Sequence, residues 1–378
     1  MKTRKIKIIH ILHSVGGVDV SLRLILNNLD SGKFESIVIH GYEDTKIGFE
    51  NNKNKPITAY QTRIKRSISP INDVKSLSFI LKILKKEKPD LIHCHSAKGG
   101  ILGKLASFLT KIPCYHTPQA YSYLSAESKL KRIIFLNIEK LFSNFNNSIL
   151  ASSVSERNRA INEVGYHPKK VKVFSNSIIP IEEVPSLKIP KTWPPEYICS
   201  VGRPSFQKNI ELMVKVISEL KETKKNIHLV LMGVGYHSPN LEKVKLLIEK
   251  YKLKENITLL EWTNRSDIFN IISNSQLYIS TARYEGLPYS VIECLSLGKA
   301  AVVSDADGNR DLIENGKNGF VISNSNPSHF SEKINILLND DSLRRKFENR
   351  SKVKFENEFD MKKNIFKLEI LYKNKVKE

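Results

Sequence analysis

The chain has 378 residues, 40% of them hydrophobic and 26% charged, which is enough for two globular domains and excludes a disordered protein. Its formal net charge is +21, and residues 1–190 hold 30 Lys and Arg against 15 Asp and Glu. A half this basic attracts anions, so nucleic acid, an anionic membrane surface and phosphorylated small molecules are the partner classes to weigh. Scattered cysteines exclude a disulfide-stapled secreted fold, and no apolar run reaches the roughly 20 residues of a spanning helix. We therefore expect a cytoplasmic protein whose membrane contact is peripheral, on the inner face of the cell membrane.

Apolar, β-branched runs of strand length alternate with amphipathic stretches of helix length, a pattern typical of parallel α/β sheets. The strands predicted in the first half are residues 6–12, 36–40, 91–95, 112–116 and 148–152. Those predicted in the second half are residues 197–201, 228–232, 257–260, 277–279 and 300–303. The sequence therefore predicts an α/β protein with two Rossmann-like parallel-sheet domains facing a cleft, where ligands bind at the carboxyl ends of the strands.

A proline-rich stretch in the middle of the chain marks the boundary between the two domains. Because proline disfavours both helix and central strand, we interpret residues 181–196 as the linker. Residues 1–180 are then the N-terminal Rossmann-like domain, and residues 197–355 are the C-terminal one. The charged tail has a helical pattern, and we expect residues 356–378 to form a C-terminal helix that packs back on the N-terminal domain.

Two glycines, Gly16 and Gly17, lie between the first predicted strand and the helix that follows it. Glycine lets the backbone approach a phosphate or a sugar closely, and a helix N-terminus adds N–H donors. A tight turn without any ligand explains the pair equally well, because glycine pairs are common at turns.

A second strand-to-helix loop reads G-R-P-S-F-Q-K-N over residues 202–209. Arg203 and Lys208 are two cations five residues apart at the end of a strand, and together they suit a diphosphate. In a chain with 60 Lys and Arg, two solvated surface cations are the simpler explanation, so this loop alone does not decide.

The most informative segment reads Y-E-G-L-P-Y-S-V-I-E-C and contains two glutamates, Glu285 and Glu293. Glu285 is predicted in the loop after a strand, Pro288 opens a helix, and Glu293 projects from that helix. Carboxylates accept hydrogen bonds from vicinal hydroxyls, which makes sugar and ribose natural partners. The N–H groups around Gly286 and Leu287 suit a phosphate. Two glutamates eight residues apart arise often by chance, so the combination with G-L-P carries this interpretation.

These motifs resemble those of the retaining, family-four glycosyltransferases of the GT-B fold (glycosyl transferases group one), and the likeness spans nearly the whole chain. Besides the two glycines, the matching segments are P-D-L-I-H-C-H-S at 89–96, S-V-S-E at 153–156, G-R-x-x-x-x-K-N at 202–209, L-M-G-V-G at 231–235, E-x7-E from 285, and G-N-R-D-L-I-E-N-G-x-N-G at 308–319. The resemblance implies a nucleotide-diphosphate sugar as donor, bound mainly by the C-terminal domain. It also implies transfer with retention at the anomeric carbon, and no metal or other cofactor.

Carried over to this chain, the resemblance gives the matching residues roles in binding the donor. Arg203 and Lys208 would neutralise the diphosphate leaving group, which gains charge in the transition state. Glu285 would hold hydroxyls of the donor sugar and Glu293 the ribose, and no dedicated general base is implied. The catalytic candidates are therefore Glu285, Arg203 and Lys208. The donor-binding candidates add Gly16, Gly17, Gly286, Leu287, Pro288 and Glu293.

The acceptor side departs from the family's pattern. Where T-P-H-G is common in the family, this chain reads H-T-P-Q-A, so Gln119 stands at the position of the family's histidine. His116 lies three residues earlier and His95 ends another predicted strand, so His95, His116 and Gln119 are the acceptor-side candidates. The basic N-terminal half fits a lipid-linked acceptor, a glycan on a polyprenyl diphosphate of the kind used in surface polysaccharide synthesis.

Four weaker signals have simpler explanations. D-A-D at residues 305–307 matches a metal-binding motif of another fold, and H-C-H at residues 93–95 lacks two further zinc ligands nearby, so we expect no metal site. Trp262 suits stacking on a nucleobase and packing in a core equally well. Residues 128–142 carry a basic lead and an apolar stripe, typical of a core-facing helix, with contact to anionic lipid as the alternative.

Two other functions remain open beside the leading prediction of a metal-independent, hexosyltransferase-like enzyme. A sugar-nucleotide epimerase or a phosphorylase-like enzyme has the same fold, and only an epimerase makes a new sugar nucleotide from the donor alone. A basic nucleic-acid-binding protein fits the charge. However, the sequence has no zinc finger, RNP-like segment or lone cationic helix, so we expect no nucleic acid partner.

Overall fold

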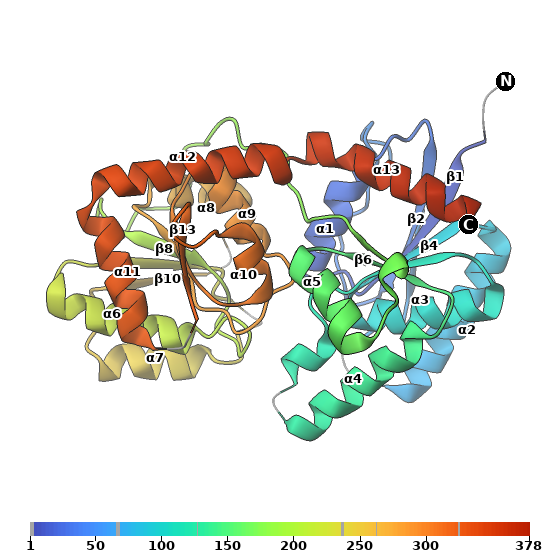
Figure 1. The fold of residues 1–378 in the computed structure, drawn as a ribbon, viewed down its shortest axis with the longest axis horizontal. Coiled ribbons are helices and arrows are strands. Elements are labelled where there is room, and N and C mark those ends of the chain that lie inside the picture. Colours follow the sequence, from blue (N-terminus) through green and yellow to red (C-terminus); the bar gives the residue numbers. More distant parts are fainter. Residues whose placement is uncertain (1–3, 66–68, 127, 236–237, 262, 324–325) are drawn as a thin grey trace. The chain divides into compact units, whose positions relative to one another are not determined.

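The structure is a computed structural model that describes residues 4–65, 69–126, 128–235, 238–261, 263–323 and 326–378. The chain folds into two compact units, both drawn in Figure 1. Unit 1 comprises Met1–Ile179 together with Asp360–Glu378, and unit 2 comprises Pro180–Phe359. The polypeptide therefore passes from one unit to the other twice, and its last helix belongs to the first unit. Within the described ranges, no helix is long and apolar enough to cross a membrane.

Unit 1 is built on a parallel sheet that, in the described part of the chain, has seven strands in the order β3-β2-β1-β4-β5-β6-β7. The strands are β1 (Ile6–Ile11), β2 (Phe34–Gly41), β3 (Ala59–Thr62), β4 (Leu91–His95), β5 (Cys114–Thr117), β6 (Ser148–Ala151) and β7 (Val171–Val173). The α-helices are α1 (Gly17–Leu26), α2 (Pro70–Glu87), α3 (Ser96–Thr110), α4 (Lys129–Ser143), α5 (Val154–Arg159) and α13 (Met361–Lys377). Short helical turns are η1 (Ser122–Ser125), η2 (Ala160–Val164) and η3 (Pro168–Lys170).

Both faces of this sheet are buried, which explains why its central strands are apolar throughout instead of alternating. Neighbouring residues Ile8 and Ile9 of β1 are fully buried on opposite faces. Ile9 packs in the cluster that contains Ile80 of α2. Ile8 packs in the cluster that contains Leu368 of α13, so the C-terminal helix completes the core of unit 1.

Unit 2 repeats the architecture with a parallel sheet whose six described strands follow the order β10-β9-β8-β11-β12-β13. The strands are β8 (Ile198–Val201), β9 (Leu229–Met232), β10 (Ile257–Leu260), β11 (Tyr278–Ser280), β12 (Ala301–Ser304) and β13 (Gly319–Ile322). The helices are α6 (Ile210–Thr223), α7 (Leu241–Lys250), α8 (Arg265–Asn274), α9 (Tyr289–Ser296), α10 (Asp307–Leu312), α11 (Pro327–Asn339) and α12 (Asp341–Glu358). The predicted α/β fold with two parallel-sheet domains is confirmed.

The proline-rich stretch at residues 181–196 lies on unit 2. Ile181 N donates to Ser296 Oγ over 3.1 Å, and Lys188 N donates to Asp267 Oδ1 over 2.7 Å. Extended backbone has free N–H and C=O groups, and here side chains of unit 2 accept from the N–H groups of Ile181 and Lys188. The predicted linker is therefore a strap held by unit 2, and the chain changes unit just before it, after Ile179.

Candidate active site

The loop after β8 brings Arg203, Gln207 and Lys208 to the carboxyl edge of the unit 2 sheet. Its backbone is tightly constrained at both ends. A Cβ added to Gly202 would come within 3.3 Å of the Lys208 side chain, and Asn209 has a left-handed φ of 51° just before α6 begins. The side chains of this loop are half-buried, so the two predicted cations are not freely solvated surface groups.

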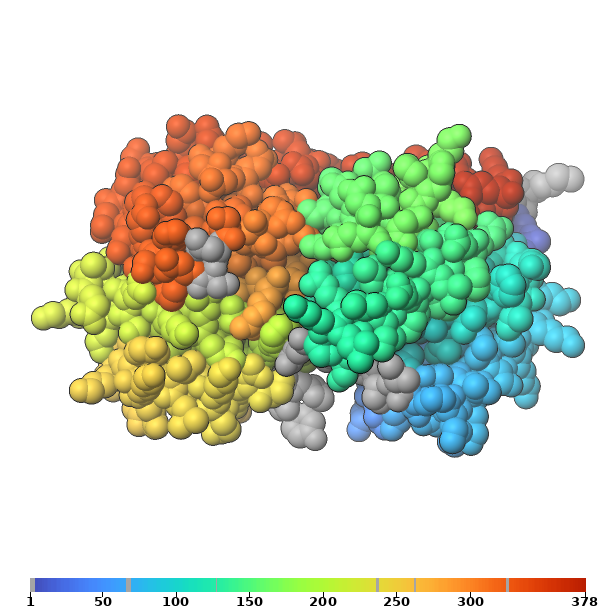
Figure 2. Space-filling model, turned by 60° about the horizontal axis from the view of Figure 1, so that its bottom comes forward, coloured from blue at the N-terminus to red at the C-terminus, as the bar shows by residue number. Residues whose placement is uncertain are grey.

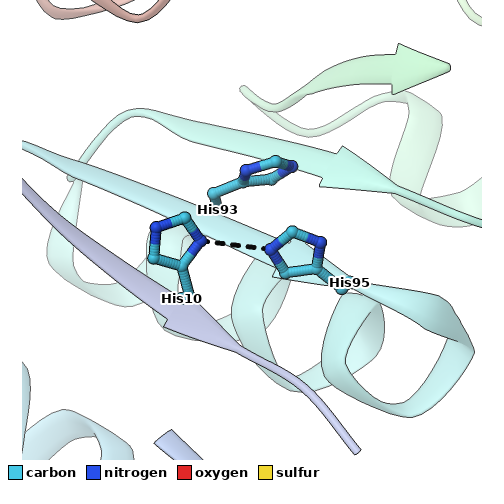
Figure 3. Close-up of side chains that lie close together, drawn as sticks. All are labelled: His10, His93 and His95. Carbon is cyan, nitrogen blue, oxygen red and sulfur yellow. Dashed lines mark hydrogen bonds between the residues drawn. The ribbon is translucent and has the colours of Figure 1, made fainter. Parts of the chain in front are cut away.

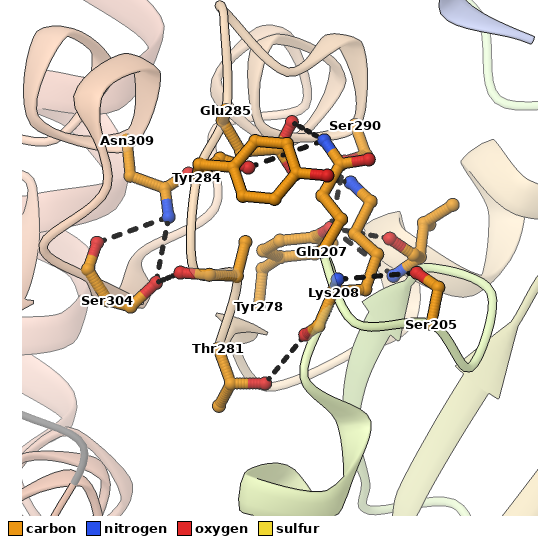
Figure 4. Close-up of polar contacts among 12 residues, drawn as sticks. Ser205, Gln207, Lys208, Tyr278, Thr281, Tyr284, Glu285, Ser290, Ser304 and Asn309 are labelled. Carbon is orange, nitrogen blue, oxygen red and sulfur yellow. Dashed lines mark hydrogen bonds and ion pairs between the residues drawn. The ribbon is translucent and has the colours of Figure 1, made fainter. Parts of the chain in front are cut away.

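Glu285 reaches this loop from the segment that follows β11, the strand that neighbours β8 in the sheet. Lys208 Nζ lies 2.7 Å from Glu285 Oε1, and Gln207 Nε2 donates to Glu285 Oε2 over 3.2 Å (Figure 4). The Glu285 side chain is only 7% exposed, so its two oxygens depend on these partners instead of bulk water. The structure thus joins two residues that the sequence analysis treated separately, and it adds Gln207, which that analysis missed.

Main-chain contacts hold the two loops together next to this ion pair. Thr281 Oγ1 donates to the carbonyl oxygens of Lys208 and Asn209 over 3.2 and 3.0 Å. Arg283 N donates to the carbonyl oxygen of Gln207 over 2.8 Å. Because these bonds start at the ends of two adjacent strands, the position of Lys208 relative to Glu285 is set by the sheet itself.

The E-G-L-P turn, which begins with Glu285, packs against α10. A Cβ added to Gly308 would lie 2.5 Å from Gly286 O and 2.7 Å from Leu287 Cα, so only glycine allows this approach. Gly286, Leu287 and Pro288 are all buried. Pro288 is the residue that caps the N-terminus of α9, one position earlier than a proline inside the helix. Packing against α10 therefore fixes the backbone of Gly286, Leu287 and Pro288, the three donor-binding residues predicted in this turn.

Glu293 lies on α9, as predicted, and its partner is a residue that the sequence analysis did not identify. Arg265, the first residue of α8, forms a close ion pair with Glu293 Oε1. Burial raises the pKa of Glu293 to about 7, against the lowering effect of Arg265. The Arg265 side chain is 45% exposed, so the pair opens to solvent from the arginine side. A hydroxyl donor arriving there meets a carboxylate that is already partly neutralised.

In unit 1, the glycine pair lies between β1 and α1. Gly16 has φ of 62° and ψ of −132°, a backbone conformation that other residues adopt only under strain, and Gly17 is the first residue of the helix. A Cβ added to Gly16 would meet nothing within 4 Å, so the glycine is required by conformation and not by crowding. Both glycines are exposed.

The three acceptor-side candidates differ sharply in exposure. His95 and His116 are fully buried, and burial lowers the pKa of both imidazoles well below the usual value. Neither presents surface to an acceptor in this conformation. Gln119 is half-buried with a left-handed φ of 54°, and its Nε2 has no hydrogen-bond partner among the described residues. Of the three, Gln119 keeps the geometry of a binding residue.

The S-V-S-E motif explains how the Gln119 loop is held. Glu156 is buried, and its Oε1 accepts a hydrogen bond from Ala120 N over 2.8 Å. Its Oε2 accepts from Ser152 N over 2.7 Å and from Ser152 Oγ over 2.9 Å. A single carboxylate therefore joins the loop after β5 to the end of β6, which is a positioning role.

His93 and His95 share one face of β4, as strand alternation predicts, and the structure adds His10 of β1 to the group (Figure 3). His10 Nδ1 and His95 Nε2 are 3.2 Å apart and share a hydrogen bond. Both ring nitrogens of His93 are occupied, by Tyr372 Oη at 2.7 Å and Thr117 Oγ1 at 2.8 Å. The remaining nitrogens of His10 and His95 point away from each other in Figure 3. Each of the three buried rings offers a nitrogen within 4.8 Å of the others, and in the structure hydrogen bonds join His10 to His95 and His93 to Tyr372 and Thr117.

The D-A-D segment is also occupied by protein groups. Arg310 donates to Asp305 and to Asp307, each over 2.5 Å, so one guanidinium joins the two carboxylates. Trp262 lies outside the described residues.

The comparisons with known proteins follow the division of the chain into two halves. Residues 15–180 match the family described as Glycosyltransferase Family 4, and residues 186–354 match the one described as Glycosyl transferases group 1. The chain belongs to the group 1, family 4 glycosyltransferases. This glycosyltransferase therefore has a family signature over nearly its whole length.

Two relatives of this glycosyltransferase have names that specify a reaction. It is 28% identical over 322 residues to the UDP-Gal:alpha-D-GlcNAc-diphosphoundecaprenol alpha-1,3-galactosyltransferase of Escherichia coli, covering 81% of each chain. It is 26% identical over 307 residues to the N,N'-diacetylbacillosaminyl-diphospho-undecaprenol alpha-1,3-N-acetylgalactosaminyltransferase of Campylobacter jejuni, covering 74% of this chain and 75% of that one.

Solved structures show the fold. The sucrose-phosphate synthase of Thermosynechococcus elongatus superposes with a TM-score of 0.82 at 14% identity, covering 98% of this chain and 99% of that one. Anabaena HepE in complex with UDP and glucose superposes with a TM-score of 0.76 at 15% identity, covering 98% and 100%. The glycosyltransferase has the two-domain GT-B fold.

Proposed function

We propose that this glycosyltransferase moves a sugar, with retention, from a nucleotide-diphosphate sugar to the glycan of a polyprenyl-diphosphate-linked acceptor in surface polysaccharide synthesis. The part of the proposal that concerns the donor rests on the group formed by Lys208, Gln207 and Glu285 at the carboxyl edge of the unit 2 sheet. The names of the relatives from E. coli and C. jejuni support the acceptor half, because each specifies a saccharide joined through a diphosphate to undecaprenol.

In the proposed reaction, the bond between the anomeric carbon and the diphosphate oxygen breaks, and its electron pair leaves with the nucleoside diphosphate. Lys208 and Arg203 offset the negative charge that this leaving group gains. The acceptor hydroxyl oxygen forms the new bond to the anomeric carbon on the same face. Its proton passes to an oxygen of the departing diphosphate, so no side chain acts as general base.

Glu285 orients the donor sugar by accepting hydrogen bonds from its hydroxyls. Its carboxylate is pre-oriented, since Lys208 and Gln207 each hold one oxygen before any substrate arrives. Binding the donor diphosphate brings a new partner to Lys208, which frees Oε1 of Glu285 for a sugar hydroxyl. Glu293 accepts from the ribose hydroxyls in the same way, in competition with Arg265.

We propose that the transfer needs no metal ion, because the two cations of the G-R-P-S-F-Q-K-N loop supply the charge that a metal supplies elsewhere. Transfer should continue undiminished in a chelator such as EDTA. A loss that added Mg²⁺ or Mn²⁺ reverses would contradict this part of the proposal.

The proposed acceptor also implies where the enzyme works in the cell. A polyprenyl diphosphate is confined to a membrane, and the first half of the chain carries a surplus of positive charge, so we propose a cytoplasmic enzyme that works on the inner face of the cell membrane.

The experiment that tests the donor half is calorimetry with a panel of uridine-, guanosine- and adenosine-diphosphate sugars. One nucleotide should bind to the wild type, and its binding should be at least tenfold weaker for Lys208→Met, which keeps most of the length of the side chain but not its charge. The matched control is Lys215→Met, an exposed lysine on α6. If none of the nucleotides binds, the donor-site assignment is wrong.

A further inference from the structure

Helix α4 is apolar on the side that faces solvent. Leu130, Ile133, Ile134 and Leu141 are 69%, 56%, 47% and 59% exposed. Every other helix in the described residues contributes at most two large exposed apolar side chains, so α4 stands apart. Scattered exposed leucines need no explanation, but four on one helix do.

These side chains lie along one face of the helix, which also carries the exposed Asn137. At 100° per residue, Leu130, Ile134 and Leu141 fall within about 40° of arc, and they span about 16 Å along the axis. Ile133 borders the stripe on one side. The stripe cannot be core-facing, because the opposite side of α4 packs inward: Phe142 is buried, and the buried Glu139 pairs with Lys104 of α3 over 2.9 Å.

Cations flank the stripe. Lys129, Lys131, Arg132 and Lys140 are all exposed on α4, and Glu139, the one carboxylate within the helix, is turned inward. The apolar surface continues past the C-terminus of the helix, where Phe108 is 49% exposed and its ring stacks 4.8 Å from that of Phe145. An apolar stripe between basic side chains is the pattern of a helix that lies in a lipid headgroup layer.

The helix is also well placed for contact. Figure 1 shows α4 along an outer edge of unit 1, far from the covering helix α13. Figure 2 shows the blue-green atoms of this segment on the visible surface. It is anchored to unit 1 by its inner side, so an attachment through its outer side holds the whole unit.

We propose that the outer side of α4 is the membrane-docking surface of this enzyme, and that its occupant is an anionic phospholipid surface. The leucine and isoleucine side chains enter the boundary between headgroups and acyl chains, while the lysines and the arginine contact phosphates. The inference rests on the proposed function, since a polyprenyl-linked acceptor is what brings the enzyme to a membrane. A second copy of the chain is the rival occupant, but the flanking positive charge disfavours self-association.

The test is flotation of the full-length protein with vesicles of phosphatidylcholine and phosphatidylglycerol, compared with phosphatidylcholine alone. We expect binding to the anionic vesicles only. The triple variant Leu130→Gln, Ile134→Gln, Leu141→Gln should bind at least tenfold more weakly, and Lys131→Gln with Lys140→Gln should lose the preference for anionic lipid. The matched control is Phe366→Gln with Ile370→Gln, the exposed pair on the lysine-rich helix α13, which should float like the wild type.

Three outcomes would overturn the proposal: a triple variant that floats like the wild type, a control that loses binding as strongly, or a wild-type dimer that the triple variant converts to monomer without any change in flotation. Transfer to an acceptor with a short, water-soluble alkyl chain separates this proposal from the proposed function. The triple variant should keep that activity. If flotation fails while this transfer persists, only the docking surface is wrong. If no acceptor is glycosylated while flotation behaves as expected, only the proposed function is wrong.

Discussion

Lys208 Nζ lies 2.7 Å from Oε1 of Glu285, a residue 77 positions further along the chain. The two side chains meet because β8 and β11 are neighbouring parallel strands whose carboxyl ends share one edge. In this ion pair, the cation that suits a diphosphate and the carboxylate that suits sugar hydroxyls neutralise each other.

Removing the Lys208 charge should reduce catalysis far more than it reduces stability. We expect Lys208→Met to lower kcat/KM by roughly 100- to 1,000-fold, as loss of one fixed transition-state contact does elsewhere. Steady-state transfer kinetics measure this, and circular dichroism checks the fold. Lys215→Met should leave both unchanged, and a Lys208→Met enzyme of near-normal turnover would mean that the lysine does not contact the leaving group.

A second prediction concerns the packing of the E-G-L-P turn. Gly308→Ala places a methyl group against Gly286 O and Leu287 Cα, at 2.5 and 2.7 Å before relaxation. Overpacking of this kind costs about 1–3 kcal/mol and must displace the turn that carries Glu285. Thermal unfolding and donor affinity should both decline. Gly48→Ala is the control, because a Cβ there meets nothing within 4 Å.

The pair of Arg265 and Glu293 predicts a pH effect on donor binding. The pKa of Glu293 is raised by burial to about 7, and Arg265 acts to lower it. Arg265→Leu should therefore raise this pKa further, so that the carboxyl group is neutral at pH 7 and accepts hydrogen bonds less well. As the pH is lowered from 9 to 6, nucleotide affinity should begin to fall at a higher pH in the variant than in the wild type. Arg350→Leu, on the exposed side of α12, should leave the profile in place.

Buried histidines predict acid instability. Burial lowers the pKa of His10 to about 3 and also lowers the pKa of His93, His95 and His116, so all four are neutral in the fold. The contribution of these histidines to the free energy of unfolding is complete above the unfolded pKa near 6.5. It is lost as the pH falls below this value, at up to about 1.4 kcal/mol per pH unit for each group.

Glu293 acts in the opposite direction between its unfolded value of 4.5 and about 7, and burial also raises the pKa of Glu348, but these are two carboxyl groups against four histidines. The midpoint of urea unfolding should therefore decrease steadily from pH 6.5 to pH 5. A midpoint that stays constant across this range would show that these histidines are accessible to protons in the folded state.

Sequence reasoning predicted the central strands well and missed β3, β7 and β13. Each of these lies at the edge of its sheet. The strands β3 (A-Y-Q-T) and β7 (V-K-V) are short and partly exposed, so they lack the apolar run that marks a buried parallel strand. The strand β13 (G-F-V-I) was missed although it has an apolar run. The central strands are buried on both faces, and their composition reveals them.

The candidate site also has residues that the sequence predicted and residues that it did not. Local motifs made Arg203, Lys208, Glu285 and Glu293 candidates, because strand ends and helix starts leave signals in the sequence. Gln207 and Arg265 were missed because their roles depend on partners 78 and 28 residues away. The same limit hid His10, which joins the H-C-H segment only when β1 pairs with β4.

The proposed reaction is tested by transfer of a radiolabelled sugar from a nucleotide-diphosphate donor to a saccharide–diphosphate–polyprenol acceptor. The product is recovered in the organic phase, and its new linkage is read by NMR. For an α-linked donor we predict that the product is an α-glycoside. No label should be transferred when the Glu285→Gln variant replaces the wild type. A β-glycoside, or label transferred equally by Glu285→Gln, would contradict a retaining reaction at this site.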